Sequence, residues 1–367
     1  MTAVSLVMAP PIASLTDEGG WVYRGVERVA YADALDRFGN LDDVTRGEDW
    51  RLSMEKQNFS RKVYGGFVDS DARTPESVVG YGLIHLPVTE NTESAFVSIV
   101  VDPARRREGI GAQIMAWVES VLAQEHRPRV MSYVLFAQPA NNASTISPAS
   151  GGSFPADAPG WLFASRHGFT LEQVERRSVC DIPVDPALLN RLESAAAPYA
   201  EGYRLHSWRN EIPDAFIDHY AAIETRMTAD APQGGIDIDE VVWTPERLRQ
   251  QITMMNAAGK DAVMAAAEHV ASGVLAGVMD LHVARAGRPD ANQEDTIVLP
   301  EHRGHRLGML LKIANLRRLA ADYPHIERIY TWNATENGPM LAINVALGFR
   351  PDGGAGELQR SGGSLVA

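Results

Sequence analysis

The same order of segments occurs twice along this chain. In the first half, an alternating apolar segment at 94–101 runs into the turn DPARRREGIGA and then into a helical pattern. In the second half, the segment at 293–299 runs into PEHRGHRLG and a second helical pattern. Both copies end alike, with a helix that closes on Gly-Phe at Phe169 and at Phe349. This repeat indicates two similar units, and 367 residues are too many for one ordinary core.

Composition excludes several classes of protein. An apolar fraction of 45% and a charged fraction of 22% are typical of a packed globular chain. A net charge of −13 argues against nucleic acid as a partner, because phosphate binding requires a basic face, and it agrees with cationic amines as substrates. No apolar stretch approaches the roughly 20 residues that span a bilayer, so no membrane partner is expected. The one cysteine, Cys180, is expected to be a buried strand residue; it allows no internal disulfide and fits a cytoplasmic location.

Other segments suggest how the chain is divided. Residues 138–160 are rich in Ser, Pro, Gly and Asn and predict a mobile surface loop. Prolines bracket a short polar helix in 181–202, so we place a boundary there, between an N-terminal domain at 1–195 and a C-terminal domain at 196–367. In the latter the patterns predict a strand, two helices and three strands, then a turn, helix, strand, helix and strand, a mixed α/β layer architecture. Residues 1–14 are apolar without the cationic start of a secretory signal and are interpreted as a lead-in segment.

The turn between strand and helix has a composition that suits phosphate. A helix N-terminus presents unpaired backbone N–H groups and about half a positive charge, so it binds phosphate oxygens. Residues 106–111, RREGIG, supply such a turn in the first half, and 303–308, RGHRLG, supply it in the second. Arginine side chains add charge-assisted contacts to a pyrophosphate.

At this turn the sequence resembles a known family. An [Arg/Gln]-x-x-Gly-x-[Gly/Ala] turn after an apolar strand is the signature of GNAT acetyltransferases. The first copy matches fully, whereas the second has Arg306 where the first glycine is usual. Residues 331–349 are similar to the strand-helix-strand closure of GNAT domains. The resemblance is closest to tandem-domain actinobacterial members, with an architecture similar to that of mycothiol synthase, and it implies two tandem GNAT acyl-CoA transferase folds.

The resemblance also implies where the co-substrate acetyl-CoA would bind, without a metal. In this family the pantetheine arm pairs with the edge of the strand before the turn. The implied contacts in the second half are Ile297, Val298 and Leu299 on the strand, Arg303, Gly304, His305, Arg306, Leu307 and Gly308 in the turn, and Asn333 and Asn337 after the next strand. A second cofactor site in the first half would use Val101, Arg106, Arg107, Gly109 and Gly111. The alternatives without a binding role are that Asn333 and Asn337 cap a helix and that the arginines are ordinary surface cations.

The catalytic groups are harder to identify. Acyl transfer to an amine needs a base, and GNAT enzymes often use a carboxylate on the motif strand, here Glu294 or Asp295. Strand alternation predicts that only one of the two faces the cleft; Glu294 shares the parity of Val298, and a bulge would swap them. Many GNAT domains carry a tyrosine acid where this chain has Asn344 in the second half and Ala164 in the first. Asn344 would position the thioester, and the thiolate would leave unassisted or take a proton from water.

These comparisons favour the second half as catalytic and the first as a non-catalytic GNAT-like domain. The predicted activity is transfer of an acetyl group to the amine of a small molecule, by direct attack in a ternary complex. Two alternatives stay open: a transferase for protein amines or longer acyl groups, and a non-catalytic acyl-CoA-binding or structural protein. The loops at 138–160 and 227–243 are the expected determinants of substrate choice.

Overall fold

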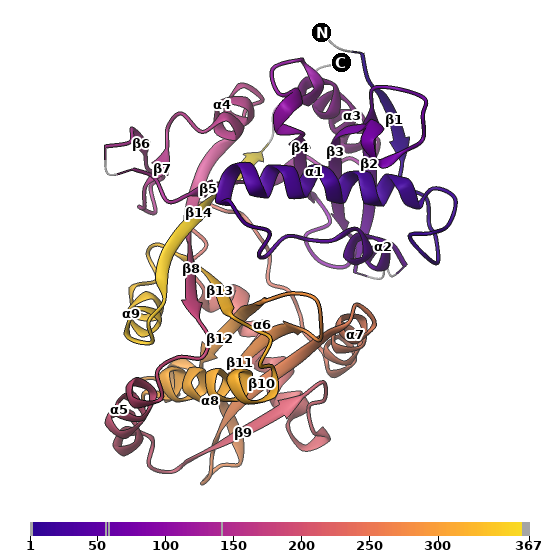
Figure 1. Ribbon diagram of the computed structural model, residues 1–367. Coiled ribbons are helices and arrows are strands. Elements are labelled where there is room, and N and C mark those ends of the chain that lie inside the picture. Colours follow the sequence, from indigo (N-terminus) through magenta and orange to yellow (C-terminus); the bar gives the residue numbers. More distant parts are fainter. Residues whose placement is uncertain (1–2, 56, 58, 141, 362–367) are drawn as a thin grey trace. The chain divides into compact units, whose positions relative to one another are not determined.

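A computed structural model describes residues 3–55, 57, 59–140 and 142–361, and the chain forms two compact units (Figure 1). The first unit contains the chain up to Val174, the segment Gly234–Ile238 and the residues from Ala355 onward. The second contains Glu175–Gln233 and Asp239–Gly354. The boundary that the sequence suggested near residue 195 therefore falls inside a helix of the second unit, α5 (Pro186–Ala196).

The first unit carries the helices and strands of the first sequence copy. Its helices are α1 (Gly20–Phe38), α2 (Gly47–Glu55), α3 (Ile110–Gln124) and α4 (Pro159–Arg166). Its strands are β1 (Ser5–Met8), β2 (Ser60–Val68), β3 (Val78–Pro87), β4 (Ser94–Val101), β5 (Arg129–Ala137), β6 (Thr145–Ile146) and β7 (Phe154–Pro155). Short 3-10 turns, η1 (Pro75–Ser77) and η2 (Pro103–Arg105), precede β3 and α3.

The second unit repeats this order. Besides α5, its helices are α6 (Asp214–Asp230), α7 (Pro245–Ala257), α8 (Leu307–Asp322) and α9 (Gly338–Ala346). Its strands are β9 (Tyr203–Arg209), β10 (Lys260–His269), β11 (Val274–Ala284), β12 (Asp290–Val298) and β13 (Arg328–Ala334). The 3-10 turns are η3 (Ala197–Ala200) and η4 (Pro300–His302). Every element that the sequence predicted in this half is present, which confirms the mixed α/β architecture.

Two long strands, β8 (Thr170–Asp181) and β14 (Arg350–Ser361), contribute residues to both units. In the first unit the strand order is β1-β2-β3-β4-β5, followed by β14 from the far end of the chain. In the second unit the order is β9-β10-β11-β12-β13, followed by β8. The pairs β4·β5 and β12·β13 are parallel. The antiparallel pairs are β1·β2, β2·β3, β3·β4, β9·β10, β10·β11, β11·β12 and β8·β13. Each unit thus depends on a strand that follows the other sequence copy.

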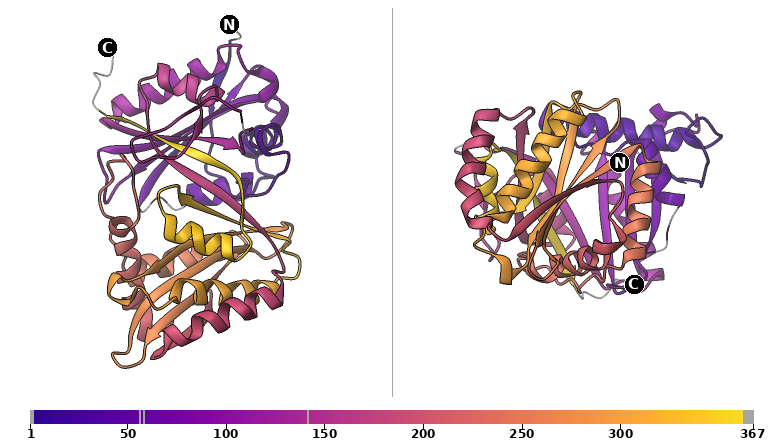
Figure 2. Two further views of the ribbon diagram at one scale, coloured as in Figure 1. Left: turned by 90° about the vertical axis from the view of Figure 1, so that its left-hand side faces the viewer. Right: turned by 90° about the horizontal axis from the view of Figure 1, so that it is seen from below.

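Helices cover both faces of the sheet in the second unit (Figure 1, Figure 2). Met279 and Leu281 of β11 lie in the core that α8 closes. Val278 of the same strand and Ile297 of β12 lie in the core that α6 and α7 close. Because neighbouring strand residues point to opposite faces, these two cores identify the α8 face and the α6 face of the sheet.

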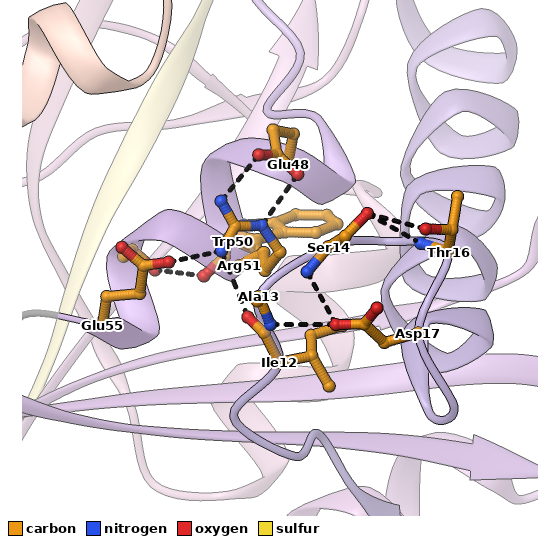
Figure 3. A network of polar contacts seen from close by, with 10 residues as sticks. Ile12, Ala13, Ser14, Thr16, Asp17, Glu48, Trp50, Arg51 and Glu55 are labelled. Atoms are coloured by element: carbon orange, nitrogen blue, oxygen red, sulfur yellow. Dashed lines mark hydrogen bonds and ion pairs between the residues drawn. The ribbon is translucent and has the colours of Figure 1, made fainter.

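The lead-in segment of the first unit is tied to the rest of its fold. β1 pairs antiparallel with β2, so part of this segment is an edge strand. Arg51 of α2 is 5% exposed, forms ion pairs with Glu48 and Glu55, and donates to the carbonyl oxygen of Ile12 (Figure 3). Figure 3 also shows that the Asp17 carboxylate accepts hydrogen bonds from the backbone amides of Ala13 and Ser14. A buried guanidinium is tolerated here because two carboxylates and a carbonyl satisfy it.

Two details concern regions singled out in the sequence. The loop at 138–160, outside the undescribed residue 141, contains the short pair β6·β7, and Phe154 is fully buried against Phe136. The prediction of a mobile surface loop was therefore wrong for this part, because an aromatic anchor fixes it. Cys180 is a buried strand residue as predicted, and burial raises the pKa of its thiol to about 11.

Candidate active site

Both phosphate-type turns fold as the repeat suggested. In the first unit, Arg107 and Gly109 have positive φ angles of 69° and 86°, and α3 begins at the next residue. In the second unit, Gly304 and Arg306 have φ angles of 87° and 56°, and α8 begins at Leu307. The two turns share one backbone path, with the glycine and the arginine exchanged between the two left-handed positions. Arg306 departs from the family signature, yet the turn keeps the same backbone path. A non-glycine residue in this left-handed conformation raises the free energy of the folded state.

The basic side chains of the second turn lie in two directions. The Arg303 Nε donates to the carbonyl oxygen of Val298 at 3.1 Å, at the end of β12. His305 Nδ1 lies 2.8 Å from the carbonyl oxygen of Tyr199. The Arg306 guanidinium lies 5.4 Å from the centre of the Tyr199 ring.

The amides of Met309 and Leu310 already donate to the carbonyl oxygen of Arg306. The first two amides of α8, at Leu307 and Gly308, are therefore the ones that could bind an anion.

At the helix start itself the residues are small or buried. Leu307 is 1% exposed and belongs to the core under α8. A Cβ placed on Gly308 would lie 3.5 Å from Cδ1 of Ile343 in α9, and one placed on Gly304 would meet nothing within 4 Å. Gly304 therefore leaves open space beside the turn.

The strand before this turn parts from its parallel neighbour. The register of β12 with β13 ends at the pair Gln293 and Thr331, although β12 continues to Val298. Beyond that pair, β12 has an open backbone edge. The first unit repeats this geometry, because the register of β4 with β5 ends at Phe96 and Met131.

The three residues expected to pair with the pantetheine arm are not equivalent. The Leu299 amide donates to Ala276 at 2.9 Å, on the side of β11. Because N–H and C=O groups alternate between the two edges of a strand, Ile297 also faces β11 and Val298 faces the open edge. The side chain of Ile297 is buried on the α6 face, and Val298 packs on the α8 face. Val298 is therefore the residue of the three with main-chain groups directed to the open edge.

Glu294 and Asp295 lie at an irregularity in β12. Met279 of β11 pairs with Thr296, and Leu281 pairs with Gln293, so three steps on β12 match two on β11. The extra residue is a β-bulge, and it places both carboxylates toward the α6 face. The prediction that alternation would leave only one of the two carboxylates on this face was wrong. Glu294 and Val298 were expected on the same face, but Glu294 lies on the α6 face and Val298 on the α8 face.

A histidine from the neighbouring strand holds the first of these carboxylates. His282 Nδ1 lies 3.2 Å from Glu294, and its Nε2 lies 3.2 Å from Asp280. Burial lowers the pKa of His282, but hydrogen bonds and charge from Asp280 and Glu294 outweigh it and raise the pKa to about 10. Burial would raise the pKa of Glu294, yet the bond to His282 brings it below its ordinary value. Glu294 is thus an ionised partner of an imidazolium at neutral pH.

The second carboxylate has a different environment. Asp295 shares a hydrogen bond with Glu224 of α6, which is 6% exposed. Burial, with the charges of Asp280 and Glu294, raises the pKa of Asp295 to about 7. Burial and the neighbouring Asp295 raise the pKa of Glu224 well above its ordinary value. Glu224 therefore keeps its proton and donates it to Asp295, a carboxylate that can take up a proton near neutral pH.

The three asparagines gather around α9. Asn344 is fully buried and donates from Nδ2 to Oδ1 of Asn333 at 2.7 Å. Asn337 is the N-cap of α9, with Oδ1 accepting from the Met340 amide at 3.3 Å. The capping role that the sequence left open thus applies to Asn337, while Asn333 and Asn344 form a pair between β13 and α9.

In the first unit the corresponding site is occupied by the unit's own side chains. Arg106 forms ion pairs with Asp33 and Asp36 of α1, both at 2.7 Å. Tyr133 of β5 makes a hydrogen bond to Ser98 of β4, across the gap where these strands part.

The remaining positions of this second predicted cofactor site lie close together. Val101 ends β4 and packs against the core under α3. A Cβ placed on Gly111 would lie 3.4 Å from the Phe163 ring. The structure thus brings Val101, Gly109 and Gly111 together at the start of α3, while Arg106 is directed to α1.

Comparison with known proteins finds a family model for part of the chain and similar solved structures for all of it. A sequence model of the acetyltransferase (GNAT) family matches residues 32–145. A solved tandem GNAT protein from the clavulanic acid biosynthesis pathway is similar over 99% of this chain and 100% of its own, with a TM-score of 0.74 and 24% identity. The chain is thus similar to the GNAT acetyltransferase family in the sequence of its first unit, and to tandem GNAT proteins in fold over its whole length. A GCN5-related N-acetyltransferase from Sphaerobacter thermophilus is similar over 97% of this chain and 95% of its own, with a TM-score of 0.59 and 13% identity.

These likenesses confirm the tandem GNAT fold predicted from the sequence. The GNAT family model matches the first unit, which contains the turn that fits the family signature fully. A comparison with curated protein sequences finds no match.

Three residues of the candidate site were not predicted from the sequence. Glu224, Asp280 and His282 come from α6 and β11, and they meet the bulge of β12 only in the folded unit. Their one sequence signal was the Asp-x-His spacing at 280–282, which places both side chains on one face of a strand. In the described part of the chain, no three His, Cys, Asp or Glu residues form a group that could hold a metal ion. No helix among the described residues is long and apolar enough to cross a membrane.

Proposed function

We propose that this protein transfers an acetyl group from acetyl-CoA to the amine of a small molecule, and that the second unit carries the reaction. The observation that carries the proposal is the arrangement around the end of β12. An open strand edge at Val298, a cationic turn at the start of α8 and two carboxylates at the bulge lie along one short stretch of chain. These are the parts that binding a pyrophosphate-linked thioester and deprotonating an amine require.

The residues present fit an acyl-CoA. Val298 would pair through its main chain with the pantetheine arm, and Arg303 would exchange its bond to Val298 for one to the pyrophosphate. Gly304 and Gly308 leave room at the turn, and Arg306 adds positive charge. An acyl-CoA bound here supplies an activated thioester. We also propose that the protein is a tandem GNAT protein of the actinobacterial type, with an architecture similar to that of mycothiol synthase.

We assign the base to the carboxylates on the α6 face. Asp295, with a pKa near 7, takes a proton from the amine, and Glu224 stabilises it by donating a hydrogen bond. Glu294 with His282 and Asp280 orients the amine and supplies negative charge for a cationic substrate. Removal of one proton gives a neutral amine, which is the form that attacks a carbonyl carbon.

The first unit is proposed to be non-catalytic. Its turn arginine is neutralised by Asp33 and Asp36, and the Tyr133–Ser98 bond lies across its strand gap. One segment of the expected substrate loop, Gly234–Ile238, packs with this unit, where the Gly235 amide donates to Glu172 at 3.2 Å. We therefore assign this domain a structural role.

The decisive experiment is release of the free CoA thiol from acetyl-CoA with a panel of small amines, peptides and protein substrates. Turnover with a small amine supports the proposal, and turnover only with peptides or proteins favours a protein acetyltransferase. Tight binding of acetyl-CoA without thiol release across the panel would leave the non-catalytic, cofactor-binding alternative.

A further inference from the structure

One buried lysine of the second unit, Lys312, has no role in the proposed reaction as described above. Lys312 of α8 is fully buried, and among the described residues its Nζ has no hydrogen-bond partner. A buried ammonium without a partner is unfavourable, so a lysine retained in such a place calls for a ligand or a reactive role. Burial lowers the pKa of Lys312 to about 7, in the range where an amine can donate and regain a proton.

The position of Lys312 on α8 follows from its neighbours one turn away. Gly308 precedes it by four residues on the same helix face and is directed to Ile343 of α9. Asn315 follows it by three residues and donates to the carbonyl oxygen of Met279 at 3.2 Å. Met279 pairs with Thr296 of β12. Lys312 is therefore bracketed between α9 and the bulge of β12, on the α8 face of the opening between β12 and β13.

The same face carries polar side chains whose oxygens are also unsatisfied. Asn344, Asn315 and Gln293 are at most 3% exposed, and one oxygen of each has no partner among the described residues. The Thr296 hydroxyl is a fourth such group. Gln293 and Thr296 share the α8 face with their cross-strand partners Leu281 and Met279. A lysine and four oxygens without partners thus lie around one end of the opening.

The carboxylates lie on the other side of the same strand. Glu294 and Asp295 face α6, whereas Lys312 belongs to α8, which covers the opposite face of the sheet. An acyl group held at the open edge would thus have acceptors for a proton on one face and a proton donor on the other.

We propose that Lys312 donates a proton to the sulfur of the acyl thioester as it departs, and that Asn344 orients this thioester beside it. The inference rests on the proposed function and extends it by naming the acid. It explains how the second unit works with an asparagine at the position where a tyrosine was expected. In this scheme the departing thiolate takes its proton from Lys312, whereas the sequence had suggested that it leaves unassisted or takes a proton from water.

Protons and electrons balance in this scheme. The carboxylate pair takes one proton from the ammonium form of the substrate, and the amine nitrogen then forms a bond to the acyl carbon. As the carbon–sulfur bond breaks, the sulfur keeps the electron pair and takes a proton from Lys312. The nitrogen loses its second proton on becoming an amide, and this proton returns to Lys312 through solvent. The carboxylate pair releases its proton to solvent, so one proton is released per turnover.

The test combines three variants of the full chain. Lys312→Met keeps an apolar stem of similar length, and Lys312→Arg keeps the charge but does not release a proton at accessible pH. Lys62→Met is the matched control, because Lys62 is a half-buried lysine of the first unit with a lowered pKa and a bond to the Ser53 carbonyl oxygen. We expect kcat to fall roughly 10²-fold or more in both Lys312 variants and to stay unchanged in Lys62→Met.

A second readout does not depend on turnover. The thiol of bound CoA is titrated by the ultraviolet absorbance of its thiolate, with binding measured by calorimetry. A protonated lysine beside the sulfur should lower the thiol pKa in the wild type and in Lys312→Arg, and Lys312→Met should return it toward the value of free CoA.

The outcomes separate this inference from the proposed function. A thiol pKa that is unchanged on binding, or still lowered in Lys312→Met, would overturn the role of Lys312 while acetyl-CoA binding stands. Undiminished kcat in both variants would do the same. If the wild type binds neither CoA nor acetyl-CoA, the proposed function fails first. Should Lys312→Met not fold, Lys312→Gln with the same two measurements replaces it.

Discussion

Gly109 and Arg306 occupy the same backbone position at the starts of α3 and α8, with φ angles of 86° and 56°. A non-glycine residue in this left-handed conformation costs about 1 kcal/mol. We therefore predict that Arg306→Gly is more stable than Arg306→Ala by about 1 kcal/mol in chemical denaturation, although both lose the guanidinium. Equal stability of the two variants would show that this position is not strained.

Loss of a turn cation should weaken cofactor binding more than it affects folding. Arg303 is held at the strand edge through Val298, close to the amides that would bind a pyrophosphate. We predict that Arg303→Ala loses about 1.5 to 3 kcal/mol of acetyl-CoA affinity in calorimetry, the contribution of a charge-assisted bond. Arg317→Ala is the control, because Arg317 lies ten residues into α8 and pairs with Glu193 of α5. A comparable loss in the control would point to net charge rather than to the turn.

The carboxylates at the bulge should affect turnover and leave affinity for acetyl-CoA largely intact. Asp295→Asn is expected to lower kcat by roughly 10² to 10⁴, the range of a lost general base. Glu224→Gln keeps the shape and a hydrogen-bond donor but removes the titratable proton shared with Asp295, so it should shift the acidic limb of the pH–rate profile. Glu294→Gln should raise KM for a cationic amine. If all three variants keep full turnover and the wild-type pH profile, the base lies elsewhere.

Two groups of this cluster make the stability of the second unit depend on pH with the same sign. The folded-state pKa of Asp295 is raised from 3.8 to about 7, so its favourable contribution is complete below 3.8 and is lost as pH rises through about 7. The pKa of His282 is raised from 6.5 to about 10, so its contribution is complete below 6.5 and is lost as pH rises through about 10.

We therefore predict that the free energy of unfolding falls between acidic and alkaline pH, and that the loss comes in two steps. Asp295→Asn should flatten the step below neutral pH, and His282→Gln should flatten the alkaline step. Urea denaturation at acidic, neutral and alkaline pH checks this. A wild-type stability that rises over the alkaline range would contradict the charge assignment of His282.

The repeat of strand, turn and helix could be predicted because each part depends on residues close in sequence. The apolar alternation at 94–101 and the glycine-rich turn after it carry their own periods, and both copies folded as expected. The exchange of β8 and β14 between the units could not be predicted. Which strand pairs with β5 depends on contacts between residues more than 200 positions apart, and no local pattern records them.

In the candidate site, too, the features set by local sequence were predicted and those set by distant contacts were not. Glu294 and Asp295 were found because they lie on a recognisable strand, but their orientation was not, since a bulge depends on the register with β11. Glu224 stands in an ordinary amphipathic helix and acquires its role only where α6 meets that bulge. Lys312 was overlooked because a lysine in a helix with basic neighbours is usually a surface residue, whereas here it lies inside the core.

The last prediction assigns catalysis to one unit. Gly111 and Gly308 stand at equivalent helix starts, where a glutamate would oppose a pyrophosphate by bulk and by like charge. Neither site is closed to a side chain, since the nearest atoms to an added Cβ are the Phe163 ring at 3.4 Å and Ile343 at 3.5 Å.

We predict that Gly308→Glu abolishes acetyl transfer and that Gly111→Glu leaves most of it, with folding checked by circular dichroism and cofactor stoichiometry by calorimetry. The first-unit turn has its arginine committed to Asp33 and Asp36, so blocking it removes little binding. Asp33→Asn combined with Asp36→Asn should release Arg106 and raise the affinity of the first unit for acetyl-CoA. If Gly111→Glu abolishes transfer and Gly308→Glu does not, the reaction belongs to the first unit, where Tyr133 at the strand gap would become the group to test.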